Sequence, residues 1–406
     1  MTAADRFRSV LANRQYRYFL ASSNSAGVGY SVYAISVVWL AYALSHDFLI
    51  VGAVLFIEFA SYTLTFLVGP VVDRVRNQRS VFLICYPVQA VAALTLGLGF
   101  LRGFLSVPVL LVLVALISLL WDFAWASGNV TPGLLLSPDE QFAASGVSGA
   151  LGGVNAIMGY AAGGALILVV GPGGGLLLYA VLLALGAALA LPLRVASPRR
   201  EVEGFRASFR TGWAAAAAGP GAPLLQLASV DALAGFLTAV PPLLVTLSTT
   251  VYFHSSPFSY SLLFTSYVVG GVASSAFLGG CNPRHRVGHV VAAALGGAGG
   301  AFVLVTVTPP DLYLLAAAWF SVGFALTAYT NAKYVFYRGA VPPDKLGRVI
   351  SNLYLFPGIS SSVGALTVGA LAGGLTPTDV GLVAATGFLL AGALAVALPG
   401  VRHLRY

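Results

Sequence analysis

Long apolar stretches recur along the whole 406-residue chain, and they constrain its fold more than any other feature. A bilayer core about 30 Å thick requires roughly 20 residues of α-helix. Strands of a membrane barrel would instead alternate apolar and polar residues. Turn-forming Gly, Pro, Ser or Asp residues separate most of the stretches. We therefore predict an all-α polytopic membrane protein with twelve transmembrane helices, at residues 18–45, 48–69, 80–101, 106–130, 141–170, 176–193, 224–248, 257–280, 290–307, 312–337, 349–374 and 380–401.

The composition excludes several classes of soluble protein. Hydrophobic residues make up 58% of the chain and charged residues only 8%, whereas soluble domains carry about 25% charged residues. An ordinary cytosolic enzyme, a nucleic-acid-binding protein and a disordered scaffold are therefore excluded. Two cysteines, Cys85 and Cys281, are too few for a disulfide framework. His285 and His289 lack a third ligand nearby, so we predict no metal site and no cofactor. The first apolar run is too long for a signal-peptide core, and no cleaved signal is expected.

The basic residues give the expected orientation. If both termini are cytoplasmic, 20 of the 21 Lys and Arg residues fall in cytoplasmic segments, and only Arg102 does not. Cytoplasmic loops of membrane proteins carry such an excess of positive charge. The net charge of +8 is thus assigned to topology rather than to nucleic-acid binding. We predict a multi-pass protein of the cell membrane with both termini in the cytoplasm.

The longest hydrophilic stretch divides the chain into related halves. We predict an N-terminal six-helix half at 1–193, a cytoplasmic linker loop at 194–223 and a C-terminal six-helix half at 224–406. Segments that begin near Ser137 and near Pro342 resemble each other at a constant offset of 205 residues. The matched pairs are Pro138 with Pro343, Asp139 with Asp344, Gly153 with Gly358, Gly159 with Gly364, and Gly164 with Gly369. Repeated halves with a binding site at their interface are an architecture of transporters.

Local signals explain the start of one helix and the use of glycine in two. Ser137 and Glu140 form the pattern of a capping box, with Pro138 at the first helical position. The glycines recur five or six residues apart and allow close approach of neighbouring helices. We expect close packing at Gly159 and Gly364, and a functional interpretation adds to it a sliding or rocking seam between the halves, with both glycines as hinges.

Residues 69–79, GPVVDRVRNQR, resemble the loop signature G-x-x-x-D-R-x-x-R-R of the major facilitator superfamily. Gly69, Asp73, Arg74 and Arg79 match, whereas Gln78 replaces a basic residue. The resemblance covers the whole chain, with twelve spans, two halves and a basic central loop. It implies that Asp73 helps to lock a cytoplasmic gate, with Arg74 and Arg79 as partners of acids or helix ends. The opening 13–45 also looks like the branch of drug and metabolite exporters.

The chain departs from the superfamily pattern at three places. The corresponding loop of the second half has Pro283 where the acid would stand. The Arg associated with proton-coupled drug antiport is not found in 118–130, and Tyr160 follows Gly159 where the antiporter signature has Pro. These departures weaken the resemblance to drug/proton antiporters in particular.

Three acids fall within predicted spans, although an acid in mid-bilayer costs roughly 2.5–3.5 kcal/mol. Asp122 shares a helix face with Trp125 and Asn129 by their spacing. In the superfamily, the first, fourth, seventh and tenth spans line the central cavity. We therefore predict Asp122 as a proton carrier or cation contact and Trp125 and Asn129 as cavity residues. Packing against a neighbouring helix is the alternative for Asp122.

The other embedded polar groups lie on the second, first, seventh and tenth spans. Asp231 and Asn24 lie at similar depths of pseudo-symmetric spans, and we predict that both face the cavity. The alternative for Asp231 is an ion pair with Lys333, which would itself be able to act as a gate. Glu58 is a further candidate for proton coupling. Pro241 and Pro242, which follow Asp231, free backbone carbonyls and mark a candidate hinge.

These features lead to a functional prediction with alternatives. We predict a monomeric secondary active transporter that exports a small amphipathic or hydrophobic compound in exchange for protons, with Asp122 and Asp231 as proton carriers. An importer or uncoupled facilitator of the same fold is the first alternative. A membrane sensor or scaffold that does not transport is the second. An intramembrane enzyme would need a nucleophile–base set or metal ligands, and the spans contain neither, so no catalytic residues are predicted.

Overall fold

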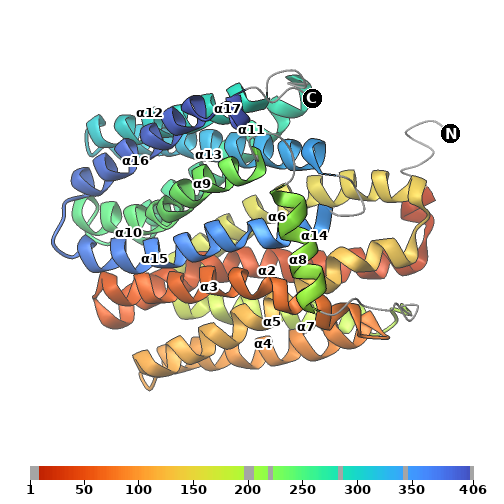
Figure 1. The fold of residues 1–406 in the computed structure, drawn as a ribbon. Coiled ribbons are helices and arrows are strands. Elements are labelled where there is room, and N and C mark those ends of the chain that lie inside the picture. Colours follow the sequence, from red (N-terminus) through yellow and green to blue (C-terminus); the bar gives the residue numbers. More distant parts are fainter. Residues whose placement is uncertain (1–8, 196–204, 218–222, 282–286, 342–345, 403–406) are drawn as a thin grey trace. The chain divides into compact units, whose positions relative to one another are not determined.

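The computed structural model describes residues 9–195, 205–217, 223–281, 287–341 and 346–402. Within these ranges some side chains are not described, among them those of Gly69 and Asp73, two residues of the predicted gating loop. Throughout the described part, the regular elements are α-helices (Figure 1). The chain divides into a first unit, Met1–Ser45 with Leu64–Val202, and a second unit, His46–Thr63 with Glu203–Tyr406.

The first unit is built from long apolar helices. They are α2 (Arg14–Ser45), the C-terminal part of α3 (Phe48–Asp73), α4 (Gln78–Leu101), α5 (Val107–Leu135), α6 (Pro138–Val170) and α7 (Pro172–Ala190). Within this unit α2 packs on α6 and α7, and α4 packs on α5 and α7. The first unit contains a close-packed interior in which Tyr33 and Tyr179 are fully buried.

The second unit adds a short amphipathic helix and two divided spans to the N-terminal part of α3. Its further helices are α8 (Phe205–Ala216), α9 (Pro223–Leu237), α10 (Val240–Tyr252), α11 (Pro257–Cys281), α12 (Val287–Val307), α13 (Leu312–Ala340), α14 (Leu346–Leu353), α15 (Leu355–Ala372), α16 (Pro377–Ala397) and α17 (Pro399–Arg402). The pairs α11–α13, α12–α13, α12–α16 and α9–α15 lie in contact.

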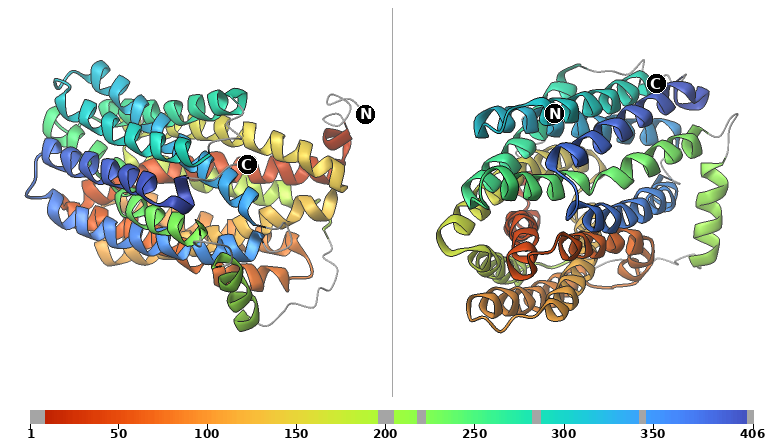
Figure 2. Two further views of the ribbon diagram at one scale, coloured as in Figure 1. Left: turned by 45° about the horizontal axis from the view of Figure 1, so that its top comes forward. Right: turned by 90° about the vertical axis from the view of Figure 1, so that its left-hand side faces the viewer.

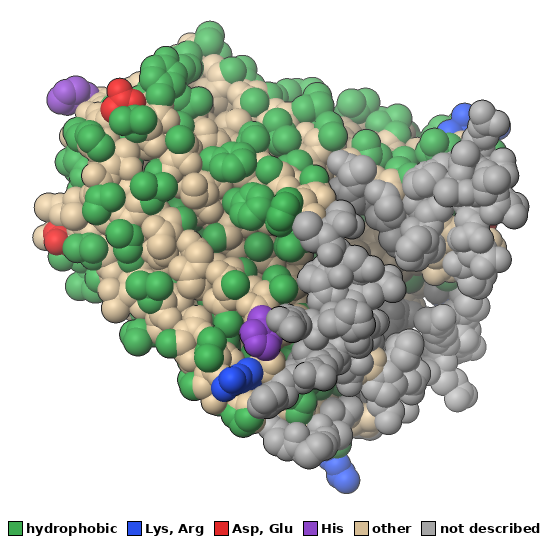
Figure 3. Space-filling model, turned by 90° about the horizontal axis from the view of Figure 1, so that it is seen from above, with side chains coloured by type: hydrophobic (Ala, Val, Ile, Leu, Met, Phe, Trp, Pro, Cys, Tyr) green, Lys and Arg blue, Asp and Glu red, His purple; other side chains and the backbone are tan. Residues whose placement is uncertain are grey.

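The prediction of an all-α membrane protein is confirmed. Eleven helices or helix pairs of the described chain are long and apolar enough to cross a bilayer, and Phe48–Leu64 of α3 is a shorter apolar segment. Figure 3 shows one face of the molecule, on which hydrophobic side chains and backbone predominate and few charged or histidine side chains are visible. Such a surface is stable in contact with lipid and would be costly in water.

Side-chain caps fix several helix starts. The backbone N–H and the hydroxyl of Ser137 both donate to Oε2 of Glu140, at 3.0 and 2.8 Å, so the predicted capping box is present at the start of α6. Thr376 and Asp379 form a second capping box at α16. The hydrogen bonds from Ser137 lower the pKa of Glu140, and the one from its backbone N–H has the largest effect. Both boxes satisfy backbone donors that a helix start otherwise leaves unpaired.

Two predicted spans are each divided into two helices. The seventh span ends as α9 at Leu237 and resumes as α10 at Val240, whose first turn contains Pro241 and Pro242. The eleventh span is divided between α14 and α15, and Pro357 lies in the first turn of α15. Proline has no N–H to donate to the preceding turn, so each proline starts a helix instead of continuing one.

Glycines that match in the sequence repeat have equivalent positions in the two units. A Cβ on Gly159 of α6 would overlap Cβ of Ser31 and lie 2.6 Å from the backbone oxygen of Val28, both in α2. A Cβ on Gly364 of α15 would overlap the backbone oxygen of Phe236 in α9. Both glycines therefore lie at close helix contacts, and their predicted role as hinges stays a prediction.

The amphipathic helix α8 belongs to the second unit and packs against α14. The side-chain amide of Asn352 donates to the backbone oxygen of Phe209 at 2.8 Å. The ring of Trp213 meets the ring of Phe356 edge-on, with centroids 5.7 Å apart. Figures 1 and 2 show α8 at a steep angle to the long helices of its unit. Part of the predicted linker loop thus forms a docked helix.

Candidate functional site

A buried ion pair joins α9 to α13 inside the second unit. Nζ of Lys333 lies 2.9 Å from Oδ1 and 3.0 Å from Oδ2 of Asp231. Asp231 is 2% exposed and Lys333 is 7% exposed. The ammonium of Lys333 contacts both carboxylate oxygens, and almost no solvent reaches the pair. Each charge is therefore neutralised by the other and not by water. The ion-pair alternative for Asp231 is therefore present in the structure.

Tyrosines complete the surroundings of this pair. The hydroxyl of Tyr329 donates to Oδ1 of Asp231 at 2.7 Å, and the hydroxyl of Tyr337 lies 3.5 Å from Oδ2. Nζ of Lys333 lies 5.5 Å from the ring centroid of Tyr329 and 5.8 Å from that of Tyr354. Aromatic rings at this range attract a cation. We call these five residues, Asp231, Lys333, Tyr329, Tyr337 and Tyr354, the charge cage.

The tyrosines of the charge cage were not assigned a role from the sequence. Tyr329, Lys333 and Tyr337 follow one another at intervals of four on α13, so they lie on one helix face. That spacing could have identified the cage once Lys333 was paired with Asp231. Tyr354 stands at the break between α14 and α15 and its hydroxyl contacts that of Tyr334. Only the fold brings it to Lys333.

An aromatic pocket of about 440 Å³ lies in the first unit. Helices α2, α4, α5 and α6 contribute its walls. Trp125 and Asn129, predicted as cavity residues, both line it. The full lining is Phe19, Ser23, Gly27, Phe82, Tyr86, Trp121, Ala124, Trp125, Gly128, Asn129, Pro132, Gly133, Gln141, Ala144 and Ser148. Among the described residues of the lining no side chain is charged, and the polar groups are hydroxyls, amides and the indole N–H groups of Trp121 and Trp125.

Two side-chain contacts connect helices of the first unit, and a third lies within α2. The amide of Asn155 on α6 donates to Oδ1 of Asn24 on α2 at 2.6 Å. The amide of Asn24 in turn donates to the backbone oxygen of Leu20 at 2.6 Å. The rings of Tyr30 and Trp121 are stacked, with centroids 4.1 Å apart and an interplanar angle of 9°. Asn24 therefore makes a helix-to-helix hydrogen bond, and its predicted role in a cavity stays a prediction.

Asp122 and Glu58, the other two acids predicted within spans, are not part of the charge cage, and they differ from each other in burial. Asp122 on α5 is 2% exposed, whereas Trp125 one turn later is 53% exposed. The two residues were predicted to share one helix face, and in the structure one end of that face is buried while the other is exposed. Glu58 on α3 is half-buried. Proton coupling by Asp122 and Glu58 stays a prediction.

In the predicted gating loop, Gln78 has a role that its place in the motif did not reveal. Its amide donates to the backbone oxygens of Val72 and Val75 at 3.2 and 3.3 Å. Its Oε1 accepts a hydrogen bond from Ser127 of α5 at 2.8 Å. Gln78 is fully buried. A neutral amide, which both donates and accepts, therefore serves here where the superfamily motif has a basic residue.

Arg74 and Arg79 of the same loop differ in exposure. Arg74 is exposed in the turn after α3, and Arg79 is half-buried near the start of α4. The side chain of Asn77 caps α4 by accepting from the backbone N–H of Arg79 at 3.2 Å. The side chain of Asp73 lies outside the described residues, so the gating role of this loop stays a prediction.

Comparison with known proteins defines the fold. No protein-family model matches the chain, and no curated protein sequence matches it significantly. Solved structures do match. Nucleoside transporter NupG has a TM-score of 0.73 and 13% identity, over 95% of this chain and 98% of that one. Peptide transporter POT in complex with sulfate has a TM-score of 0.74 and 14% identity, over 97% and 96%. A POT family transporter in complex with 5-aminolevulinic acid has a TM-score of 0.72 and 10% identity, over 95% and 96%.

These matches cover almost the whole chain at low sequence identity. Together with the eleven span-length helices or helix pairs and the shorter segment Phe48–Leu64 of the described residues, they show that the chain has the major facilitator fold. None of the three matched structures is described as an exporter, and the exporter branch rests on the sequence resemblance alone.

Proposed function

We propose that the chain is a secondary active transporter that exports a small amphipathic or hydrophobic compound by alternating access, driven by protons. The observation that carries this proposal is the charge cage, a buried ion pair inside a major facilitator fold. Intramembrane ionisable residues are expensive, and their usual purpose is an ion or substrate pathway. Asp231 is therefore the principal proton carrier of the proposal.

The geometry of the cage supports a mechanism of charge switching. When a proton binds the carboxylate of Asp231, the attraction to Lys333 is lost and a buried ammonium is left without compensation. The cost of that state, about 3–5 kcal/mol, favours a rearrangement in which Lys333 reaches water. Tyr329 and Tyr337, whose hydroxyls face the carboxylate oxygens, would hold Asp231 in place. The two six-helix halves are the bodies that rock, with Pro241 and Pro242 as the candidate hinge.

The aromatic pocket supports a neutral amphipathic substrate. Trp121 and Trp125 offer flat apolar surfaces, and Asn129 and Gln141 offer amide hydrogen-bonding groups. A substrate with several negative charges would require cationic side chains, and the described residues of the lining include none. Protonation of Asp122 and Glu58, and gating by Asp73 with Arg74 and Arg79, complete the proposed cycle. The protein acts in the cell membrane with both termini in the cytoplasm, as a monomer.

An importer or uncoupled facilitator of a narrow range of metabolites is the second candidate. It is favoured by the nucleoside and peptide transporters among the matched structures. Nucleosides and short peptides are also small and amphipathic, and both would find stacking and hydrogen-bonding partners in the aromatic pocket.

The test uses purified protein in liposomes with an imposed pH difference. Lipophilic dyes, nucleosides and dipeptides are offered in turn, and accumulation is compared with and without the proton gradient. The proposal expects gradient-driven accumulation by the wild type and its loss in the neutral double variant Asp231→Asn/Lys333→Met, with exchange of substrate without a gradient retained. Ser321→Ala is the matched control, because the half-buried hydroxyl of this α13 residue donates within its own helix to the backbone oxygen of Ala317.

Two outcomes would overturn this proposal. Equal gradient-driven accumulation by the double variant would remove the cage from proton coupling. Equal transport with and without a gradient in the wild type would replace the coupled exporter by a facilitator. For a wild type that depends on the gradient, reversing the gradient separates export from import. An exporter that exchanges substrate for protons accumulates the substrate on the side from which protons leave, whereas a proton-coupled importer accumulates it on the side that protons enter.

A further inference from the structure

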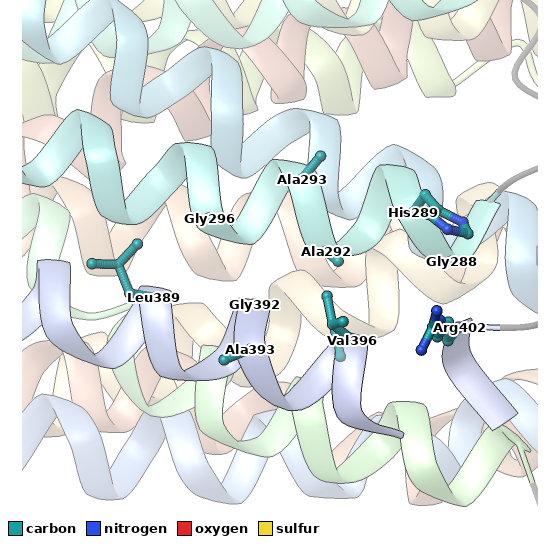
Figure 4. Close-up of a pocket in the computed structure, with 11 residues that line it drawn as sticks. Gly288, His289, Ala292, Ala293, Gly296, Leu389, Gly392, Ala393, Val396 and Arg402 are labelled. Atoms are coloured by element: carbon teal, nitrogen blue, oxygen red, sulfur yellow. The ribbon is translucent and has the colours of Figure 1, made fainter. Parts of the chain in front are cut away.

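A groove on the second unit runs between α12 and α16 and ends at α17. Its volume is about 450 Å³, and small residues predominate in its walls. It is lined by Gly288, His289, Ala292, Ala293, Gly296, Leu389, Gly392, Ala393, Ala395, Val396 and Arg402. Figure 4 shows His289 and Arg402 at one end and Leu389 at the other, with Gly296 and Gly392 between them.

The glycines of the groove have two separate roles. A Cβ on Gly288 would overlap the backbone oxygen of Val401, and a Cβ on Gly392 would lie 3.0 Å from the backbone nitrogen of Gly296. These two glycines therefore allow α12 to approach α16 and α17. A Cβ on Gly296 itself would meet nothing within 4 Å. Gly296 is thus not needed for packing, and its missing side chain leaves the groove open.

One end of the groove carries basic side chains, and the other end is apolar. His289 and Arg402 are exposed, at the first turn of α12 and the last residue of α17. Among the described residues that line the groove, none is acidic. From His289 to Gly296 the helix rises about 10 Å, which is roughly a third of a 30 Å bilayer core. The groove therefore combines a basic end at the membrane surface with a small-residue channel that extends toward the bilayer interior.

We propose that this groove binds one anionic phospholipid, with its phosphate on Arg402 and His289 and an acyl chain along Gly296. Lipid-facing space in a bilayer is filled by hydrocarbon, and basic pockets at the membrane surface attract anionic headgroups. A second copy of the chain is disfavoured as the occupant. A two-fold symmetric contact through this groove would bring the two Arg402 ends together, where like charges repel. The inference requires membrane embedding but is independent of transport and its direction.

The test is native mass spectrometry of the purified full chain with phosphatidylglycerol and phosphatidylcholine of identical acyl chains. We expect the wild type to retain phosphatidylglycerol about fivefold more strongly, the effect of one basic residue near a membrane surface. Arg402→Gln is expected to remove this preference. Gly296→Leu is expected to weaken the binding of both lipids at least tenfold, because its side chain would occupy the groove from a position where a Cβ meets nothing within 4 Å.

Gly300→Leu is the matched control for the groove variant. A Cβ at Gly300 also meets nothing within 4 Å, it lies one turn further along α12, and it does not line the groove. Lipid binding unchanged by Gly300→Leu but reduced by Gly296→Leu supports the proposal. Equal retention of the two lipids by the wild type, or equal effects of the two leucine variants, would overturn it. If the wild type is a dimer and Gly296→Leu is a monomer, the occupant of the groove is a second copy of the chain and the lipid proposal is wrong.

Discussion

Replacing Lys333 by Met is expected to destabilise the second unit strongly, because it leaves the carboxylate of Asp231 buried without a cation. In the wild type the ammonium lies 2.9 and 3.0 Å from the two carboxylate oxygens. After the replacement, the polar groups of the charge cage near Asp231 are the hydroxyls of Tyr329 and Tyr337, at 2.7 and 3.5 Å. Met has a similar shape to the Lys stem, so packing changes little.

The magnitude follows from the burial of both partners. Breaking a buried ion pair by removing one partner costs about 3–5 kcal/mol, whereas removing both with apolar or neutral groups of similar volume is often neutral. We expect Lys333→Met and Asp231→Asn each to lose roughly that amount. The double variant is expected to remain within about 1 kcal/mol of the wild type, because neither charge is then left alone. The coupling energy of the cycle would therefore be at least about 5 kcal/mol in magnitude.

The assay is reversible unfolding in mixed micelles, followed by tryptophan fluorescence, for the wild type, the two single variants and the double variant. Tyr329→Phe and Tyr337→Phe provide a graded comparison. The first removes a 2.7 Å hydrogen bond to the carboxylate and is expected to cost about 1.5–3 kcal/mol. The second removes a 3.5 Å contact and is expected to cost less. A loss below about 1 kcal/mol for Lys333→Met, or additive effects in the cycle, would refute the reasoning.

Three further predictions concern the first unit. Gly159→Ala is expected to destabilise it by about 1–3 kcal/mol through overpacking against α2, whereas Gly152→Ala in the same helix, where a Cβ meets nothing within 4 Å, is expected to be neutral or stabilising; equal melting temperatures would contradict this. Gln78→Ala is expected to cost about 1–3 kcal/mol, and a cycle with Ser127→Ala should show coupling because the two side chains share one hydrogen bond. The lowered pKa of Glu140 means that its ionised form stabilises the fold above the ordinary value of 4.5 and that this contribution is lost as the pH falls below it. The melting difference between the wild type and Glu140→Gln should therefore shrink on acidification, and a difference independent of pH would exclude the helix cap as its source.

The sequence predicted the features that depend on local chemistry. Helix lengths follow from the thickness of the bilayer, and the capping box at Ser137 and Glu140 follows from residues three apart in the chain. Glycines matched at a constant offset indicated where helices approach closely, and Gly159 and Gly364 lie at such contacts. These signals are readable because each depends on neighbours along one helix or on the composition of one segment.

Other features were visible only in part. The prolines at 241 and 242 indicated a weak point in the seventh span, but the break into α9 and α10 lies before them, because a helix can start with proline but not continue through it. The break at Tyr354 was not predicted. Asp122 and Trp125 were expected to share one helix face, but Asp122 is buried and Trp125 is exposed. Burial depends on which neighbouring helix covers each position, and the sequence of one helix does not reveal this.

By itself, the sequence determined that the chain spans a membrane with helices, because the bilayer allows few other solutions for a chain so rich in apolar residues. It also determined which acids are costly to embed. The tertiary structure alone decided how those costs are met. Asp231 and Lys333 are 102 residues apart in the chain, and only the packing of α9 and α13 in one unit brings them into contact. In the same way, Gln78 meets Ser127 because α4 packs against α5. His289 and Arg402 line one groove because α12 contacts α17.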